Sequence, residues 1–252
     1  MRAEAWGGQS AQRYPCDPRN PRPDRKLRCE DNQLVMPIIE VEFSHAVMSY
    51  KRLLGTGFVL DQGNRFVTAK HVVQGAATFV AFETVDRRFV SVDLRMIATH
   101  PKEDFAVFEL NPPRPGSGLK LDSTPQNSSL KYDMWGYPED FLFESDQRGA
   151  HGAILPRPEL IYTAGYIRRR VSHSLLGLPG NCFYELSSIA GSGSSGGPII
   201  EINRSTLHWH IFGIYIGERT IEVANRPPRE IAYAARIDAD VDFFRDNGCE
   251  VL

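Results

Sequence analysis

Short apolar runs with alternating polar positions dominate the chain from about residue 35 onward. The runs are rich in Val, Ile, Phe and Thr, and Gly, Asn, Asp or Pro separates them. β-Branched and aromatic residues at a period of two are typical of half-buried strands. The first set of runs covers residues 38–44, 55–61, 65–73, 78–84, 88–100 and 104–110. The second set covers residues 132–138, 159–170, 181–188, 197–202, 208–217 and 230–238.

The last segment, residues 238–248, has a different pattern. Aspartates precede the apolar residues Val241, Phe243 and Phe244, which recur within one helical turn, and Gly248 follows them. An acidic cap and a glycine stop predict one short helix. Regular strands without alternating helices predict an all-β fold, with two antiparallel six-stranded β-barrels packed side by side and a short C-terminal helix.

Changes in composition divide the chain into five parts. Residues 1–34 are rich in Pro and Arg and lack periodic apolar positions, which predicts an extended or disordered arm. Residues 113–129 have the Pro, Gly and Ser content of a connector. We therefore expect the first barrel over residues 35–112, the second over 130–237, and a helix and tail over 238–252.

Length and charge narrow the class of protein. A chain of 252 residues with 42% hydrophobic and 24% charged residues is ordinary for a soluble globular protein. A net charge of -2 argues against a general affinity for nucleic acid. The first residues lack the apolar core of a secretory signal, and no apolar run reaches the length of a membrane span, so we expect a cytoplasmic protein without membrane contact. The cysteines, which form no CxxC pair, are expected to be free thiols; they are Cys16, Cys29, Cys182 and Cys249.

The stretch "GSGSSGGP" at residues 191–198 is either a flexible linker or the loop of a nucleophilic serine. The apolar segment "PIIEI" follows at once, as expected of a buried strand, and this continuity favours the nucleophile. A serine hydroxyl needs a base within hydrogen-bond reach, and histidine is the side chain whose ordinary pKa lies nearest neutrality. A carboxylate must then hold that base in one tautomer.

Three blocks supply these residues in order: "FVTAKHVV" contains His71, "EDFAVFEL" contains Asp104 and "GSSGGPII" contains Ser195. They resemble the signature blocks of the trypsin-like (chymotrypsin-fold) serine peptidases. "GTGFVL" and "WGYP" are similar to the bacterial branch that includes the high-temperature-requirement proteases. The resemblance implies a serine endopeptidase that uses a Ser195-His71-Asp104 triad and no cofactor. Glu103, adjacent to Asp104, is the alternative carboxylate.

The resemblance also implies roles for residues around the nucleophile. The backbone amides of Gly193 and Ser195 would form an oxyanion hole, for which glycine supplies the backbone freedom. The residues implied for the substrate pocket are Ile189, Ala190, Ile214, Tyr215 and Ile216. Because no acidic residue occupies the implied base of this pocket, we expect cleavage after small or medium aliphatic residues.

The residue before the nucleophile departs from part of the family. Zymogen-activated members have an aspartate there, whereas this chain has Ser194, so activation by a newly cut amino terminus is not expected. We expect a polypeptide substrate and a regulatory protein partner that contacts the N-terminal arm or the surface loops 142–158 and 172–181. A catalytically silent, peptide-binding relative is the alternative.

Two further clusters have a simpler interpretation. Strand alternation puts His208 and His210 on one face, as a metal pair requires, but the sequence suggests no third ligand, and we expect no metal site. The basic run at residues 168–170 is expected to be a solvated turn rather than a phosphate site.

Overall fold

The computed structural model describes residues 34–44, 47–85, 88–114, 117–143, 156–203, 208–222, 224–225 and 227–252. The strands are β1 (Val35–Ser44), β2 (Val47–Val59), β3 (Arg65–Thr68), β4 (Phe79–Val85), β5 (Arg88–Thr99), β6 (Ala106–Asn111), β7 (Leu119–Leu121), β8 (Lys131–Gly136), β9 (Ile161–Ser172), β10 (Cys182–Leu186), β11 (Pro198–Asn203), β12 (His208–Ile221) and β13 (Arg229–Arg236). The helices are α2 (Lys70–Val73) and α3 (Val241–Asp246), and the 3-10 turns are η1 (Glu139–Phe141) and η3 (Ile237–Ala239).

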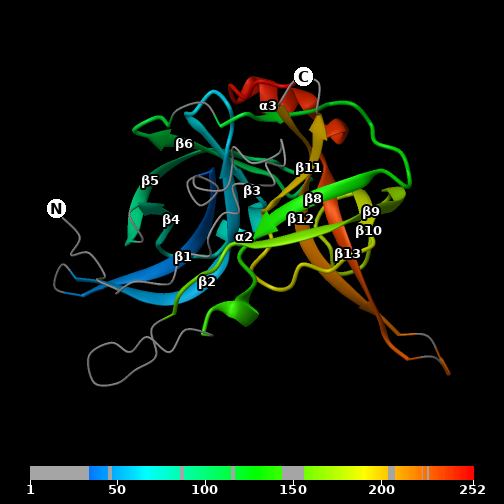
Figure 1. Cartoon of the computed structure of the whole chain (residues 1–252), viewed down its shortest axis with the longest axis horizontal. Helices are drawn as coiled ribbons and strands as arrows, with labels where there is room; N and C mark the ends of the chain where they lie inside the picture. Colours follow the sequence, from blue (N-terminus) through cyan, green and yellow to red (C-terminus); the bar gives the residue numbers. More distant parts are fainter. Residues whose placement is uncertain are drawn as a thin grey trace, which may run out of the picture.

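The first six strands form a closed antiparallel barrel in the order β1-β2-β3-β6-β5-β4 (Figure 1). Its interior is filled by aromatic and branched side chains from alternate positions, as the period of two predicts. Phe58, Phe66 and Phe108 are completely buried there, and the rings of Phe66 and Phe108 meet edge to face at 6.4 Å. The predicted first barrel is therefore present.

Strand β2 is longer than the predicted run at 55–61, because it begins at Val47. Its first half contains Lys51 and Arg52, whose side chains pair with Glu40 of β1 at 2.9 and 2.7 Å. Sequence periodicity missed this half because its charges are satisfied by a neighbouring strand rather than by an alternating apolar face.

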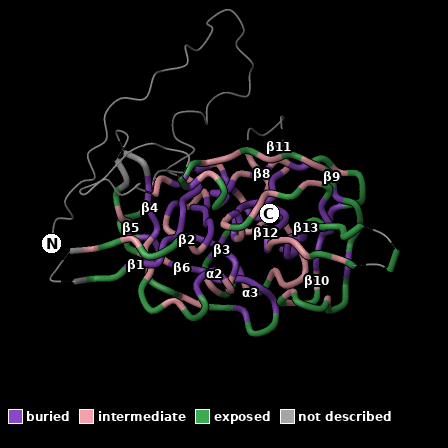
Figure 2. Tube along the Cα trace, turned by 90° about the horizontal axis from the view of Figure 1, so that it is seen from below, coloured by how far each residue is buried: buried purple, intermediate pink, exposed green. Residues whose placement is uncertain are grey.

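The second barrel follows the order β11-β8-β9-β10-β13-β12 and is closed by pairing of β11 with β12. Strand β7, which lies within the predicted connector 113–129, adds to β12 as a parallel strand. Tyr184 and Phe212 pack edge to face at 5.5 Å in the interior. Buried residues line the inner sides of both barrels, and exposed residues occupy the outer turns (Figure 2). The all-β fold with two six-stranded barrels is thus confirmed.

The short C-terminal helix is also confirmed. The Asp240 side chain caps α3 by accepting a hydrogen bond from the Phe243 amide, and Gly248 follows the helix with a φ of 74°. Phe244 is completely buried and its ring lies 4.9 Å from that of Phe105, which immediately precedes β6. The helix therefore packs onto the first barrel although it follows the second in sequence (Figure 1).

The domain boundaries remain a prediction. Of the arm predicted over residues 1–34, all but Leu34 lies outside the described residues. Cys16 and Cys29 fall in the same segment, whereas Cys182 and Cys249 are free thiols. None of the helices among the described residues is long or apolar enough to span a membrane.

Candidate active site

His71 lies on the single helical turn α2, which follows β3 within the run 65–73 predicted as a strand. Val72 and Val73 of this turn are buried, which anchors it against the barrel. The side chain of His71 stays 36% exposed. The turn thus presents an accessible imidazole on a fixed backbone.

Asp104 binds His71 with both carboxylate oxygens. Oδ1 accepts a hydrogen bond from the His71 backbone amide at 2.9 Å, and Oδ2 lies 2.5 Å from His71 Nδ1. Asp104 is completely buried, in the loop between β5 and β6. Because Nδ1 is held by the carboxylate, Nε2 is the ring nitrogen left to meet a reactant.

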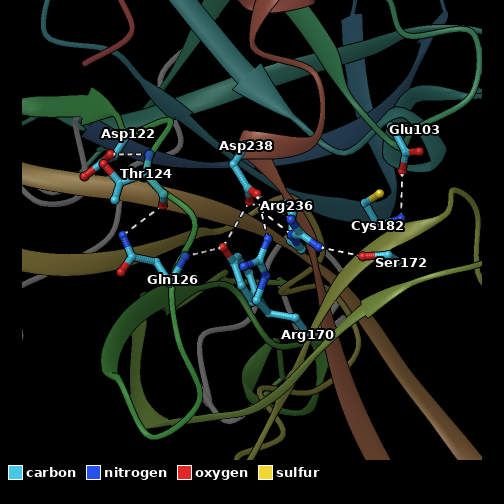
Figure 3. Close-up of polar contacts among 10 residues, drawn as sticks. Glu103, Asp122, Thr124, Gln126, Arg170, Ser172, Cys182, Arg236 and Asp238 are labelled. Atoms are coloured by element: carbon cyan, nitrogen blue, oxygen red, sulfur yellow. Dashed lines mark hydrogen bonds and ion pairs between the residues drawn. The ribbon is translucent and has the colours of Figure 1, made fainter.

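The adjacent carboxylate, Glu103, faces the second barrel instead. Its oxygens accept hydrogen bonds from the backbone amides of Asn181, at 3.0 Å, and Cys182, at 3.3 Å, where β10 begins. Figure 3 shows Glu103 beside Cys182. Of the two carboxylates that the sequence left open, the one in contact with His71 is Asp104.

The glycine-serine stretch forms a tight loop between β10 and β11 rather than a linker. The Ser194 amide donates to the Gly191 carbonyl at 3.1 Å, and the Ser194 hydroxyl donates to the Ala190 carbonyl at 2.9 Å. Gly193 and Gly196 both have a φ of 90°. A Cβ atom at Gly196 would lie 2.0 Å from the Thr56 carbonyl oxygen, so no larger residue fits there.

Thr56 of β2 joins this loop to the first barrel. Its backbone amide donates to the Ser195 carbonyl at 2.7 Å, and its hydroxyl donates to the Gly193 carbonyl at 2.9 Å. A Cβ atom at Gly55 would lie 2.7 Å from both the Ser195 carbonyl oxygen and the Val72 side chain, next to His71. The structure therefore brings Ser195 to the interface of the two barrels, beside the His71 turn.

Ser195 is half-buried. Within the described ranges, its hydroxyl makes no hydrogen bond to His71 or to any other residue. The Ser194 and Gly196 amides donate to backbone carbonyls, whereas among the described residues no acceptor is found for the Gly193 and Ser195 amides. Two free backbone donors thus lie on either side of Ser194, next to an accessible hydroxyl.

The residues predicted for the pocket lie in different environments. Ile189 is 42% exposed, whereas Ile214 and Ile216 are buried. The Tyr215 hydroxyl accepts a hydrogen bond from the Ala190 amide at 3.1 Å, so these two residues meet. Burial of Tyr215 raises the pKa of its phenol.

Glu218 and Gly217 belong to the same neighbourhood, and sequence reasoning missed both. The Tyr215 hydroxyl donates to Glu218 Oε2 at 2.8 Å. A Cβ atom at Gly217 would lie 3.7 Å from Ser195 Oγ. The register of β12 against β13 shifts between Tyr215 and Gly217, and this bulge, which strand alternation does not reveal, brings Gly217 beside the Ser195 loop.

The other polar clusters have protein partners. His210 Nδ1 lies 2.9 Å from Asp122 Oδ2, and the described residues contain no group of three side chains suited to a metal ion. The arginines at residues 168–170 lie within β9, not in a turn, and pair with Glu185 and Asp238. Figure 3 shows Arg170 beside Asp238 and Arg236.

The family model of the trypsin-like peptidase domain matches residues 55–207 of this chain. This segment contains His71, Asp104 and Ser195. The chain belongs to the trypsin-like peptidase family. It is a serine endopeptidase, a hydrolase of peptide bonds. A comparison with curated proteins gives no match.

Solved structures with this fold include an HtrA-type protease, AlgW, with a decapeptide, and the active form of the Rv3671c protease from M. tuberculosis. AlgW is 16% identical, with a TM-score of 0.59, over 85% of this trypsin-like peptidase and 64% of the AlgW chain. Rv3671c is 17% identical, with a TM-score of 0.57, over 96% of this chain and 95% of its own. The chain thus spans about two thirds of the length of AlgW and almost all of Rv3671c. At these identities the likeness is one of fold.

Proposed function

We propose that this trypsin-like peptidase cleaves polypeptides through a Ser195-His71-Asp104 triad and an acyl-enzyme intermediate. The single observation that carries the proposal is the buried Asp104 carboxylate bound to His71 beside the Ser195 loop. Ser195 Oγ attacks the scissile carbonyl carbon while His71 Nε2 takes its proton, and His71 then returns the proton to the leaving amine. Water hydrolyses the resulting ester by the same proton transfers in reverse, and Asp104 stabilises the imidazolium each time.

The oxyanion of the tetrahedral intermediate is proposed to accept hydrogen bonds from the amides of Gly193 and Ser195. The free state of these amides, next to bonded neighbours, supports this assignment. Backbone donors held before the reaction cost no reorganisation when charge develops on the oxygen. The close packing of Gly196 against Thr56 would keep them in place.

The proposed specificity is for small or medium aliphatic residues such as Ala, Val or Leu before the scissile bond. The pocket is proposed to consist of the five residues predicted from sequence: Ile189, Ala190, Ile214, Tyr215 and Ile216. Four of these residues are aliphatic and the fifth is a neutral phenol, so none of the five supplies a charge to pair with a Lys or Arg side chain. Profiling of cleavage sites in a denatured proteome tests this, and a dominant Lys, Arg or Glu signature would contradict it.

A second candidate is a protease that a regulatory partner switches on. The observation that favours it is the absence, within the described residues, of a hydrogen bond between Ser195 and His71. Such bonds are often long in unliganded enzymes and tighten on binding. The contact surfaces proposed for this partner are the N-terminal arm and the loops 142–158 and 172–181.

A fluorophosphonate probe tests both proposals, because it reacts only with an activated serine. Labelling of the purified chain supports an active triad, and labelling that requires an added partner supports the switched enzyme. No labelling and no peptide hydrolysis under either condition would leave the catalytically silent peptide binder. The free thiols of Cys182 and Cys249 suit the proposed cytoplasmic location, which cell fractionation tests.

A further inference from the structure

The loop that carries Asp104, residues 100–104, joins β5 to β6 without regular secondary structure. Its ends are closed by the His100 amide, which donates to the Phe105 carbonyl at 2.9 Å. Because Asp104 holds His71 through two hydrogen bonds, the conformation of this loop sets the position of the His71 imidazole.

The His100 side chain shapes the loop from inside. Its Nδ1 accepts hydrogen bonds from the amides of Lys102, at 3.0 Å, and Glu103, at 2.6 Å. A ring nitrogen that accepts from two amides carries no proton, so the proton of the neutral ring is on Nε2. One side chain thus satisfies the two backbone donors that directly precede Asp104.

The other ring nitrogen connects this loop to the C-terminal helix. His100 Nε2 lies 2.7 Å from Asp240 Oδ2, and Asp240 Oδ1 caps α3 by accepting from the Phe243 amide at 3.2 Å. The His100 ring meets those of Phe105 and Phe243 edge to face, at 5.9 and 4.9 Å, and its side chain is only 6% exposed. The ring is therefore fixed in both position and tautomer.

The His100 backbone also contacts the helical turn that carries His71. Its carbonyl accepts a hydrogen bond from Lys70 Nζ at 2.8 Å, and the Lys70 amide donates to the Asp104 carbonyl at 3.2 Å. Lys70 directly precedes His71 on α2. His100 thus lies between the turn that carries the histidine and the loop that carries the carboxylate.

We infer that His100 is a positioning residue that sets Asp104 against His71, with Asp240 of the C-terminal segment holding its ring. The inference rests on the proposed triad and adds to it a second histidine-aspartate pair that touches no reacting atom. The C-terminal helix is then part of the support of the active site. A misplacement of about 1 Å in such a support lowers turnover by roughly 100-fold.

Two substitutions of His100 test the contacts of its two ring nitrogens separately. The oxygen of His100→Asn reaches the place of Nδ1 and keeps the acceptor for the two amides, while losing Asp240. The amide nitrogen of His100→Gln reaches the place of Nε2 and keeps Asp240, while losing that acceptor. We expect His100→Asn to retain kcat within about threefold and His100→Gln to lose roughly 10- to 100-fold in kcat, both with KM unchanged. Peptide hydrolysis measured at a temperature where both variants are folded gives these values.

A purely structural role for His100 predicts a different result, in which the two variants lose activity in proportion to their loss of thermal stability. Equal losses in kcat, or an unchanged kcat in His100→Gln, would overturn the inference. The proton resonance of the His71 Nδ1-H bound to a carboxylate decides the matter even if the wild-type chain hydrolyses nothing. Its loss in His100→Gln and survival in His100→Asn would support the positioning role while the proposed hydrolysis failed, and its survival in both would overturn that role.

Discussion

The two barrels hold their parts of the proposed active site in different ways. In the first barrel, side-chain hydrogen bonds from Asp104 and His100 fix the histidine turn and the carboxylate loop. In the second, backbone hydrogen bonds and glycines with positive φ fix the loop of Ser195, together with the hydroxyls of Thr56 and Ser194. A substitution such as Asp→Asn changes one atom of a hydrogen-bonded side chain and keeps the shape of that side chain. A Gly→Ala substitution adds an atom for which the tight loop has no room. Substitutions in the first barrel should therefore alter chemistry, and substitutions in the second should alter packing.

Ser195 is the exception in the second barrel, because its hydroxyl is proposed to react. We expect Ser195→Ala to lower kcat on the order of 10⁶-fold and to abolish fluorophosphonate labelling, since the triad acts as a unit. Ser192→Ala is the matched control, because Ser192 is exposed and, among the described residues, its hydroxyl makes one 3.4 Å contact, with Glu139. Labelling that survives in Ser195→Ala would move the nucleophile to another serine.

Asp104→Asn tests the side-chain hydrogen bonds of the first barrel, because asparagine has nearly the same shape as aspartate. An amide in this place favours the wrong imidazole tautomer and stabilises no imidazolium, so we expect kcat to fall about 10⁴-fold. Glu103→Gln should cost less than about tenfold, because its remaining carbonyl can still accept from the amides of the second barrel. A larger loss in Glu103→Gln than in Asp104→Asn would reverse the assignment of the carboxylate.

Gly196→Ala tests the close packing of the glycine loop in the second barrel. The added Cβ would meet the Thr56 carbonyl oxygen at 2.0 Å, and we expect the free energy of unfolding to fall by about 3 kcal/mol in urea titrations. Gly75→Ala is the matched control, because Gly75 has a similar φ of 82° and a Cβ atom added there would meet no other described residue within 4 Å, its chain neighbours aside. The control should lose about 1 kcal/mol from backbone strain alone. Equal losses at the two sites would show that the close approach to Thr56 is not what requires glycine.

Activity should respond to pH through the first barrel, since that half holds the proposed base. A histidine base must be unprotonated to accept a proton, so kcat/KM should fall as the solution is made acidic. Peptide hydrolysis across pH 5 to 8, with circular dichroism at each pH to verify folding, measures the profile. A flat profile in folded enzyme would argue against a histidine base.

The smallest expected effect concerns Asp240. The hydrogen bond from His100 holds the pKa of the Asp240 carboxyl below its ordinary value, so its charge stabilises the fold near neutral pH and ceases to do so as the pH falls and the carboxyl protonates. Asp240→Asn should lower the free energy of unfolding by under about 1 kcal/mol at pH 7, because solvent screens a side chain that is 40% exposed, and by less at pH 3. Asp242→Asn, at an 87% exposed side chain, should change nothing at either pH. An equal effect of Asp240→Asn at both pH values would contradict the role of its charge.

Much of the fold could be read from local pattern. The period of two predicted the barrels because their interiors accept alternate side chains, and the aspartate before Val241 with the glycine at 248 predicted the C-terminal helix. The glycines around Ser195 indicated a tight loop because only such residues tolerate its backbone angles. The pattern did not predict the first half of β2, because its lysine and arginine pair with Glu40 on the neighbouring strand.

The strand runs, the capped terminal helix and the three blocks that contain His71, Asp104 and Ser195 could be predicted from the chain alone, because each depends on residues close together in sequence. Three contacts became visible only in the folded molecule: Asp104 rather than Glu103 binds His71, His100 binds Asp240, and Thr56 binds the Ser195 loop. These partners come from distant segments, and His100 and Asp240 are separated by 140 residues. A hydrogen bond depends on distance and angle in space, and no local pattern of residues specifies either one until the strands have closed into barrels.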